Sequence, residues 1–291
     1  MIVFHHNDAD GRSSAAITKR WFDKHWPIES PFKLQDTNGR VVFVEVDYAR
    51  AVPIESILAN EMVAIVDFSF RPEDMVRIQS ATKVGVIWCD HHKTAERYGY
   101  DVPGVRDFTN KGMAGCECTW KFFFPNQDKP DWIRILGDYD AWRMCERDKC
   151  LPFYEGLKME NQTPGTDGNI WDRLLDDQTD ATVEAITLQG ACAMKYRDNY
   201  CKELREAFGY ATVIGGHQAY AMNAYRFGSL AFGSKMLEFP VCIAYIHDGR
   251  KYTVSLYSET VDVSVIAKSF GGGGHKGAAG FVCDVLPWHV S

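Results

Sequence analysis

Short apolar runs recur along the first 90 residues and alternate with stretches of helical pattern. The run at 61–68 is apolar almost throughout, as strands buried on both faces of a sheet tend to be. Strands that alternate with helices indicate βαβ units and an open parallel sheet, with a site at the carboxyl ends of the strands. The expected strands are residues 1–4, 40–48, 61–68 and 83–89, and the expected helices are residues 15–25, 53–59, 71–81, 112–124 and 131–143.

The pattern changes in the second half of the chain. Residues 155–169 are rich in Gly, Asn, Thr and Pro and predict a loop, whereas residues 180–208 have a helical composition interrupted only by Gly190. Strands are expected at 211–223, 240–247 and 250–258, followed by a helix at 261–269. We therefore predict an α/β fold with a doubly wound, mainly parallel sheet domain at 1–178, a helical linker at 179–210 and a smaller C-terminal α/β domain at 211–291.

The composition is that of a globular protein. With 46% hydrophobic and 24% charged residues, the chain is not expected to be disordered. Its 291 residues favour two domains of roughly 100–200 residues each. No apolar run approaches the roughly 20 residues of a membrane helix, and the N-terminus lacks a signal-peptide pattern. The nine cysteines are odd in number and lack the paired spacing of a zinc site. We expect a cytoplasmic protein with reduced thiols and no membrane partner.

The formal net charge of −7 bears on the partners of the chain. Proteins that bind duplex DNA usually present an excess of basic residues, so duplex DNA is not an expected partner. Two divalent cations would add four positive charges and leave −3, which admits a short anionic substrate. The sequence leaves the oligomeric state open.

The first candidate site residues follow the N-terminal strand. His6, Asp8 and Asp10 alternate with other residues, so a chain that stays extended through them would point all three side chains to one face. His5 would point to the other face. Converging carboxylates repel one another unless a cation neutralises them, and oxygen ligands with an imidazole suit Mn²⁺ or Mg²⁺. We therefore expect a metal site at the carboxyl end of this strand.

Two later strands also end on acids or imidazoles. The strand at 61–68 ends near Asp67, and the strand at 83–89 is followed by Asp90, His91 and His92. A single Asp at a strand end is more often a turn residue or a helix cap, and an Asp-His-His triplet can be a solvated turn. The joint arrangement at three strand ends is what favours a functional site.

A fourth contribution is expected from the helix at 131–143. It contains Asp138 and Asp140, which are two positions apart and therefore about 200° apart around an α-helix. The two carboxylates are not expected to face one site. We select Asp138 as the ligand and keep Asp140 in reserve.

These residues suit hydrolysis assisted by two metal ions. Two ions about 3.5–4 Å apart can share one carboxylate, activate water and neutralise charge on the phosphorus under attack. Asp67 is the expected shared ligand. His92 is expected to face the substrate, and Asp90 is expected to orient His91. The first ion would be bound by His6 and Asp8, and the second by Asp10, His91 and Asp138.

A run of four glycines precedes His275 and Lys276. Ordering glycine is entropically costly, so the run suggests that the backbone must approach a ligand closely. The unhindered N–H groups of Gly272, Gly273 and Gly274 can form an anion-binding nest, and His275 and Lys276 can donate to phosphate oxygens. A flexible linker is the alternative, but the ordered patterns on both sides favour a binding segment.

Taken together, these motifs resemble the DHH phosphoesterase superfamily with its DHH-associated C-terminal domain, and most closely its oligoribonuclease and nano-RNase branch. The resemblance spans nearly the whole chain. It implies a phosphodiesterase with two Mn²⁺ ions, or Mg²⁺ in their place, in the N-terminal domain and a substrate-gripping C-terminal domain. It also implies that His92 contacts the scissile phosphate and His275 a substrate phosphate. The family's fourth motif commonly has an aromatic residue four positions after its Asp, as Trp142 follows Asp138.

One position departs from the family pattern. Related exonucleases usually carry Arg immediately before the Ser that ends a strand like residues 253–258, whereas this chain has Tyr257. An aromatic side chain can stack on a base, worth about 1–3 kcal/mol, so Tyr257 is a candidate substrate-binding residue. Lys276 or Arg250 could supply the missing positive charge.

We therefore predict an enzyme that hydrolyses short single-stranded oligonucleotides or dinucleotides to mononucleotides. Other activities stay open: phosphoanhydride hydrolysis, as in the pyrophosphatases and exopolyphosphatases of the superfamily, or cyclic nucleotide hydrolysis. A protein that binds nucleotides without catalysis also fits the pattern, although the complete set of metal ligands argues against it.

Overall fold

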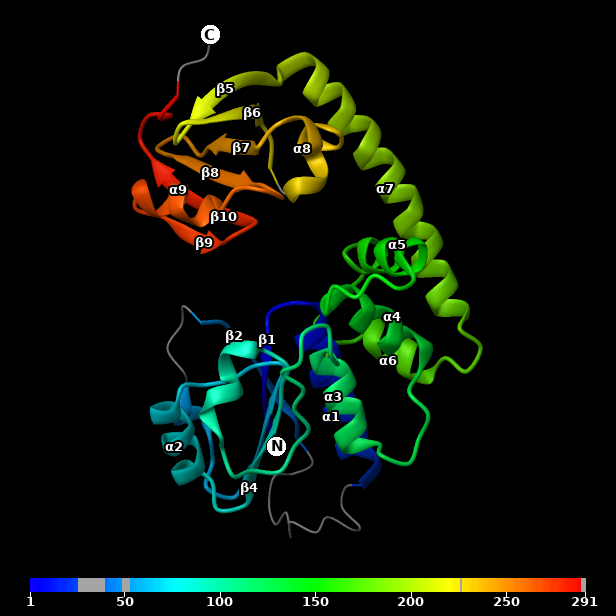
Figure 1. The fold of residues 1–291 in the computed structure, drawn as a ribbon. Coiled ribbons are helices and arrows are strands. Elements are labelled where there is room, and N and C mark those ends of the chain that lie inside the picture. Colours follow the sequence, from blue (N-terminus) through cyan, green and yellow to red (C-terminus); the bar gives the residue numbers. More distant parts are fainter. Residues whose placement is uncertain (26–39, 49–52, 226, 289–291) are drawn as a thin grey trace. The chain divides into compact units, whose positions relative to one another are not determined.

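The computed structural model of the 291-residue chain describes residues 1–25, 40–48, 53–225 and 227–288. The chain forms two compact units, Met1–Cys192 and Ala193–Ser291. The division falls inside the long helix α7 (Ala181–Phe208), which confirms the helix expected at 180–208 (Figure 1). The domain boundaries expected near residues 178 and 210 stay predictions.

The first unit is built on a parallel sheet, as predicted. Its strands lie in the order β2-β1-β3-β4, and each neighbouring pair is parallel. The central strands β1 and β3 are almost entirely buried, which explains their nearly continuous apolar sequence. The bounds of the strands are β1 (Ile2–His6), β2 (Val42–Val46), β3 (Met62–Val66) and β4 (Gly85–Cys89).

Helices cover both faces of this sheet (Figure 1). On one face α1 (Ala9–His25) and α3 (Gly115–Phe123) pack in a core that includes Val3 of β1. On the other face α2 (Pro72–Ala81) contributes Met75 and Ile78 to a core that includes Phe4. Successive residues of β1 thus face opposite layers, and the doubly wound architecture is confirmed.

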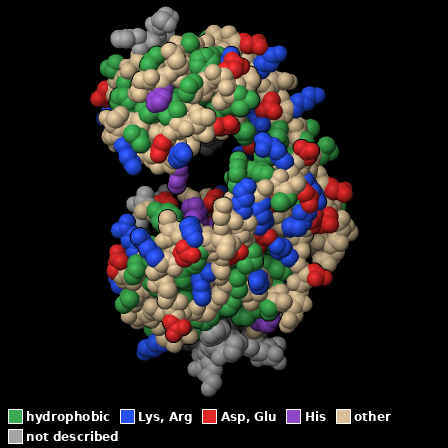
Figure 2. Space-filling view, viewed as in Figure 1, with side chains coloured by type: hydrophobic (Ala, Val, Ile, Leu, Met, Phe, Trp, Pro, Cys, Tyr) green, Lys and Arg blue, Asp and Glu red, His purple; other side chains and the backbone are tan. Residues whose placement is uncertain are grey.

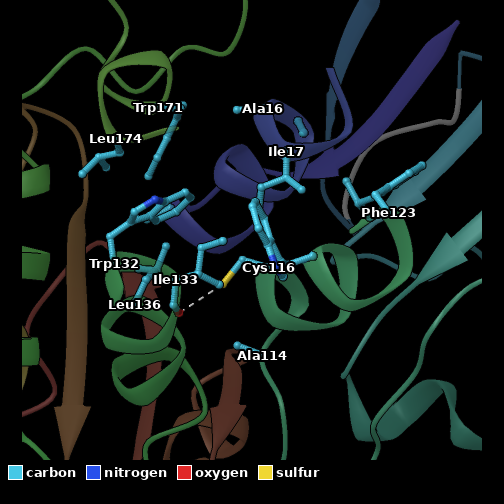
Figure 3. Close-up of a cluster of buried hydrophobic side chains, with 14 of the residues drawn as sticks. Ala16, Ile17, Ala114, Cys116, Phe123, Trp132, Ile133, Leu136, Trp171 and Leu174 are labelled. Atoms are coloured by element: carbon cyan, nitrogen blue, oxygen red, sulfur yellow. Dashed lines mark hydrogen bonds between the residues drawn. The ribbon is translucent and has the colours of Figure 1, made fainter. Parts of the chain in front are cut away.

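A further layer of helices extends the core beside α1 and α3. Trp132 of α4 (Asp131–Asp140) and Trp171 of α6 (Ile170–Asp176) lie with ring centroids 6.0 Å apart. Figure 3 shows Trp171 next to Trp132, and Cys116 of α3 next to Ile133 of α4, where its Sγ lies 3.8 Å from the carbonyl oxygen of Ile133. These contacts join α4 to α6 and α3, and α4 also packs against α1.

The helix α5 (Arg147–Leu157) was not expected, because Pro152 lies within it and the predicted loop overlaps its end. α6 was also not expected. α5 packs against α7 through two glycines: a Cβ on Gly190 would lie 1.7 Å from the carbonyl oxygen of Pro152, and a Cβ on Gly156 would lie 2.1 Å from that of Ile186. Gly190 therefore permits a close helix contact rather than interrupting α7.

The second unit is built on a mixed sheet in the order β5-β6-β7-β8-β10-β9, in which β6 and β7 are parallel and the other neighbours antiparallel. Residues 211–223, expected as one strand, form a hairpin because Gly215 and Gly216 turn the chain with φ of 56° and 80°. The strands are β5 (Tyr210–Ile214), β6 (His217–Asn223), β7 (Val241–His247), β8 (Tyr252–Tyr257), β9 (Gly273–His275) and β10 (Ala278–Cys283).

Helices also lie on both faces of the second sheet. α9 (Val263–Ser269) packs on one face, whereas the 3₁₀ helix η3 (Gly228–Phe232) and α8 (Lys235–Glu238) pack on the other. In the first unit the expected helix at 53–59 is reduced to η1 (Ile54–Ser56), and η2 (Lys93–Tyr98) follows β4. In the described ranges, no helix has both the length and the apolar composition needed to cross a membrane.

Candidate metal centre

Three strands of the first sheet bring polar side chains to one edge. β1 ends at His6, Asp67 follows β3, and residues 90–92 follow β4. Because the strands are parallel and adjacent, their carboxyl ends lie side by side. The N–H of Asp67 donates to the carbonyl oxygen of Cys89 at 2.8 Å, which keeps β3 and β4 together up to this edge. Figure 2 shows histidine atoms reaching the surface of the first unit, and the side chains of His6, His91 and His92 are partly exposed.

The chain does not stay extended through His6, Asp8 and Asp10. β1 ends at His6 and α1 begins at Ala9, so the expected alternation of the three side chains along a strand is wrong. Oδ1 of Asp8 accepts a hydrogen bond from the N–H of Gly11 at 2.9 Å, which satisfies a donor in the first turn of α1. A Cβ on Gly11 would lie 2.4 Å from the carbonyl oxygen of His6, so this strand-to-helix turn requires glycine.

The turn still brings the three side chains to the same edge. Nδ1 of His6 lies 2.7 Å from Oδ2 of Asp8. Asp10 is buried, and its carboxylate accepts hydrogen bonds from the N–H groups of Gly115 (2.6 Å) and Cys116 (2.8 Å). These donors open α3, where a helix carries partial positive charge. α3 therefore holds Asp10 in place, a contact that no sequence motif indicated.

Asp67 lies at the centre of this edge. It is 1% exposed and has a φ of 52°, a left-handed conformation that is uncommon for a residue with a Cβ. Its Oδ1 lies 3.2 Å from Nε2 of His91, and its Oδ2 lies 3.8 Å from Nδ1 of His6. Within the described residues, neither oxygen has a hydrogen-bond partner. Because a buried carboxylate without partners is costly, this geometry suits a cation at each oxygen.

α4 supplies Asp140, not Asp138, to the site. Oδ2 of Asp140 lies 3.2 Å from Nε2 of His91. Oδ2 of Asp138 instead accepts a hydrogen bond from the N–H of Glu146 at 3.1 Å, and its Oδ1 lies 3.5 Å from Nε of Arg143. The two acids of α4 do face different surroundings, as the helical spacing required. The carboxylate of Asp138 lies outside the donor groups found among the described residues and stabilises the turn after α4.

Burial and neighbouring charges perturb the acids of the site. Burial raises the pKa of Asp67 well above its ordinary value, and the carboxylates of Asp10 and Asp8 raise it further. Burial, Asp10 and Asp8 also raise the pKa of Asp140. For Asp8, burial alone would raise the pKa, but the contact with His6 lowers it to about 2. Carboxylates crowded in this way ionise together only when positive charge lies between them.

Asp90 orients His92 rather than the imidazole of His91, which corrects the expectation from sequence. Oδ1 of Asp90 lies 2.7 Å from Nδ1 of His92 and accepts hydrogen bonds from the backbone N–H groups of His91 (2.8 Å) and His92 (3.3 Å). Its Oδ2 accepts a hydrogen bond from the hydroxyl of Ser69. Burial alone would lower the pKa of His92, but the hydrogen bond with Asp90 and the surrounding carboxylates raise it.

The donor atoms of this edge form overlapping groups, each with its ligand atoms within 4.8 Å of one another. Oxygen donors combined with imidazole suit Mn²⁺ or Mg²⁺, so the side chains present fit these ions. Asp67 belongs to more than one group, as a shared ligand would. The groups found among the described residues are His6, Asp8 and Asp67; Asp10, His91 and Asp140; and Asp67, His91 and His92.

The glycine-rich segment of the second unit forms an edge of its sheet. β9 pairs antiparallel with β10. The N–H groups of Gly271 and Gly272 donate to the carbonyl oxygens of Lys268 (3.0 Å) and Ala267 (2.9 Å), where they close the end of α9. The expected nest of three free N–H groups is therefore wrong at Gly272, because its N–H already closes the end of α9.

The side chains expected to bind substrate lie at and beside this edge. His275 and Lys276 are exposed where β9 turns into β10. Ala278 pairs with both His275 and Tyr257, and side chains of directly paired residues project from the same face of a sheet. His275 and Tyr257 thus share one face of the second sheet, where Tyr257 is partly buried against Phe232.

Comparison with known proteins gives a likeness in fold. No protein-family model matches the chain. Uncharacterized protein R106 of Acanthamoeba polyphaga mimivirus is 22% identical to this chain over an alignment 298 residues long. The alignment covers 96% of this chain and 66% of that protein, so the chain spans just under two thirds of the length of its relative. The pGpG-specific phosphodiesterase PggH from Vibrio cholerae has a TM-score of 0.57 at 12% identity, covering 98% of this chain and 93% of PggH. The PF0399 DHH domain, from a member of a family of ribosomal proteins, has a TM-score of 0.58 at 15% identity, covering 97% of this chain and 82% of that structure.

Proposed function

We propose that this chain, which has the fold of the DHH phosphoesterase superfamily, is a metal-dependent phosphodiesterase that hydrolyses short oligonucleotides or dinucleotides to mononucleotides. One observation carries the proposal. The buried carboxylate of Asp67 presents its oxygens to two different donor groups and lacks a hydrogen-bond partner in the described part of the chain. Such a carboxylate suits a position between two ions, for which Mn²⁺ is our assignment and Mg²⁺ the alternative.

The assignment of ligands follows the donor groups. When bound, the ions supply an activated water molecule and neutralise charge on the phosphoryl group. Hydrogen bonds from the N–H groups of Gly115 and Cys116 hold the carboxylate of Asp10 in place. The first ion is assigned to His6, Asp8 and Asp67, and the second to Asp67, Asp10, His91 and Asp140.

His92 is assigned to the substrate phosphate. Asp90 engages its Nδ1 at 2.7 Å, which leaves Nε2 as the ring nitrogen able to donate to a phosphate oxygen or to the leaving oxygen. Asp90 is itself held by the Ser69 hydroxyl, and that hydroxyl accepts a hydrogen bond from Nε1 of Trp88 at 3.0 Å. Asp90 is therefore a positioning residue for His92.

Two observations support a short nucleotide substrate. A protein of similar fold is a pGpG-specific phosphodiesterase, which makes a dinucleotide the first substrate to test. In addition, exposed His275 and Lys276 offer donors to a substrate phosphate, and Tyr257 shares the face of His275 and can meet a base. Of the glycines beside them, Gly273 and Gly274 are assigned to backbone contact with the same substrate.

Turnover of a dinucleotide, a longer RNA, a cyclic dinucleotide and pyrophosphate with Mn²⁺ in one assay tests the proposal. We expect the dinucleotide to be cleaved to mononucleotides. Cleavage of pyrophosphate alone would assign phosphoanhydride hydrolysis instead. Absence of phosphodiester cleavage with all of these substrates would refute the proposed function.

Asp67→Ala tests the shared ligand. We expect this variant to lose metal-dependent turnover, because both ions lose a common ligand. Asp284→Ala, at an exposed acid of the second unit, is the control and is expected to behave as the wild type. Full activity of Asp67→Ala would refute the two-ion assignment.

A further inference from the structure

A cavity of about 330 Å³ adjoins the metal centre within the first unit. His91 and Asp140 form part of its wall, and Lys93, Lys111 and Trp142 are among the other lining residues. The last three have no role in the metal centre. The volume lies near the lower end of the range for small-molecule sites, about 300–1,000 Å³. A ligand group in this cavity would therefore lie next to two of the assigned metal ligands.

The lining combines an aromatic surface with two ammonium groups. Trp142 is 58% exposed, so much of its indole is accessible to a ligand. Lys93 and Lys111 are also exposed. Lys93 lies 2.7 Å from Glu96, but an exposed ion pair contributes little to stability and can give way to a phosphate. The cavity thus offers a stacking surface and positive charge together.

Backbone strain is concentrated at this cavity and at the metal centre. Lys111 has a φ of 58° and Trp142 a φ of 51°, both in the left-handed region that favours glycine. Such conformations cost free energy in larger residues and cluster at ligand sites. In the described ranges five non-glycine residues have positive φ, and three of them are Asp67, Lys111 and Trp142.

Contacts around Arg143 preform the cavity. Its Nη1 donates to the carbonyl oxygen of Gly112 at 2.7 Å and to Oε2 of Glu117 at 2.8 Å. Gly112 lies on one wall of the cavity, and Arg143 directly follows Trp142 on the other. The rings of Tyr139 and Trp142 meet edge to face, with centroids 5.8 Å apart and an interplanar angle of 67°. The two walls are therefore tied together without a ligand.

We propose that this cavity binds one nucleotide of the substrate, with its base stacked on Trp142 and its phosphate held by Lys93 and Lys111. This assignment rests on the proposed function and extends it to a named subsite. Every base has a π-face that can stack on an aromatic ring, and lysine binds phosphate as a point charge. The cavity should therefore accept nucleoside monophosphates with little preference among bases.

Calorimetric titration of the full chain, with Mn²⁺ present, by guanosine 5′-monophosphate and by guanosine tests the cavity. Trp142→Ala is expected to weaken binding of both ligands by about 5-fold to 150-fold, the range for one stacked base. Trp142→Phe should retain most of the affinity, because phenylalanine keeps an aromatic face. Lys111→Gln should weaken binding of the monophosphate more than that of guanosine, which has no phosphate.

Lys202→Gln is the matched control, because Lys202 is an exposed lysine of α7 that lies 3.9 Å from Glu206. A loss of monophosphate affinity in Lys202→Gln equal to that in Lys111→Gln would overturn the proposal, and so would unchanged affinity in either Trp142→Ala or Lys111→Gln. If Trp142→Ala does not fold, Lys111→Gln decides the question.

Dinucleotide cleavage separates this proposal from the proposed function. If the wild type cleaves the dinucleotide but its affinity for the monophosphate does not depend on Trp142, the proposed nucleotide binding in the cavity is refuted and the phosphodiesterase activity is supported. If the affinity for the monophosphate depends on Trp142 but the protein cleaves no phosphodiester, nucleotide binding in the cavity is supported and the phosphodiesterase activity is refuted.

Discussion

The backbone of Gly115 lies directly against the side chain of Asp67: a Cβ added to Gly115 would lie 2.5 Å from Cβ of Asp67 and 2.6 Å from its Oδ1. Gly115 also donates its N–H to Asp10 at 2.6 Å. The first residue of α3 therefore touches one carboxylate of the candidate metal centre and holds another. The missing side chain at this position is a structural requirement of the site.

Gly115→Ala is expected to displace Asp67 and to weaken Mn²⁺ binding by about 10–100-fold, the range for changes to groups that position metal ligands. Titration of the metal-free protein with Mn²⁺ measures the effect. Thermal unfolding of the metal-free variant is the control, because a retained melting temperature separates a local clash from loss of the fold. Wild-type affinity for Mn²⁺ would contradict the role given to Gly115.

Asp140→Asn and Asp138→Asn separate the two acids of α4. Asp140→Asn is expected to lower metal-dependent turnover by about 100-fold or more, since it removes a charged ligand. Asp138→Asn should keep the Mn²⁺ affinity of the wild type. It should lose about 1–2 kcal/mol of unfolding free energy, because the carboxylate of Asp138 accepts a hydrogen bond from Glu146 and pairs with Arg143 in the turn after α4. Loss of Mn²⁺ binding in Asp138→Asn with retention in Asp140→Asn would reverse the assignment.

Glu117 links pH to the stability of the first unit. It is 3% exposed and forms ion pairs with Arg143, at 2.8 Å, and with Lys129. Burial alone would raise the pKa of Glu117, but the hydrogen bonds from these cations and from the N–H of Ala114 lower it below the ordinary 4.5. A lowered pKa in the folded state stabilises the protein above about pH 4.5, and this stabilisation is lost as the pH falls through the folded-state value.

Glu117→Gln is therefore expected to lower the unfolding free energy by about 3 kcal/mol at pH 7, near the lower end for a broken buried ion pair because Lys129 is partly exposed. The difference from the wild type should shrink below about pH 4.5, as urea unfolding at several pH values would show. Glu146→Gln, which breaks an exposed pair with Arg134, is the control and should cost about 0–1 kcal/mol. A difference independent of pH would contradict the role of the Glu117 charge.

Gly190→Ala is expected to destabilise the protein, although the same substitution usually stabilises a helix. Alanine normally stabilises a helix interior by roughly 0.5–1 kcal/mol relative to glycine. Here its Cβ would lie 1.7 Å from the carbonyl oxygen of Pro152, so we expect a loss of about 1–3 kcal/mol, seen as a lower melting temperature. Gln189→Ala, at the exposed neighbouring position, should have little effect. A higher melting temperature in Gly190→Ala would contradict the close contact of α5 and α7.

Elements with a strong local pattern were predictable, and elements shaped by their neighbours were not. The apolar runs of β1 and β3 are long enough to identify buried strands, and α7 has a continuous helical composition. α5 escaped prediction because Pro152 disfavours a helix locally, while its contact with α7 stabilises one. The hairpin of β5 and β6 was missed because its turn consists of only Gly215 and Gly216.

The sequence by itself determined the parallel sheet of the first unit and the gathering of His6, Asp67 and His91 at one edge, because strand periodicity and parallel order follow from local patterns. It also carried the resemblance to the DHH phosphoesterase fold. Only the tertiary structure decided which acid of α4 faces the site, since packing around Trp132 sets the rotation of that helix.

Only the tertiary structure also decided the support of Asp10 by Gly115, which is 105 residues further along the chain. It also decided the cavity beside Trp142, whose walls come from separate segments joined by Arg143. These features depend on contacts between residues far apart in sequence. A local pattern of polar and apolar residues does not encode such contacts, because they arise only when the helices pack against the sheet.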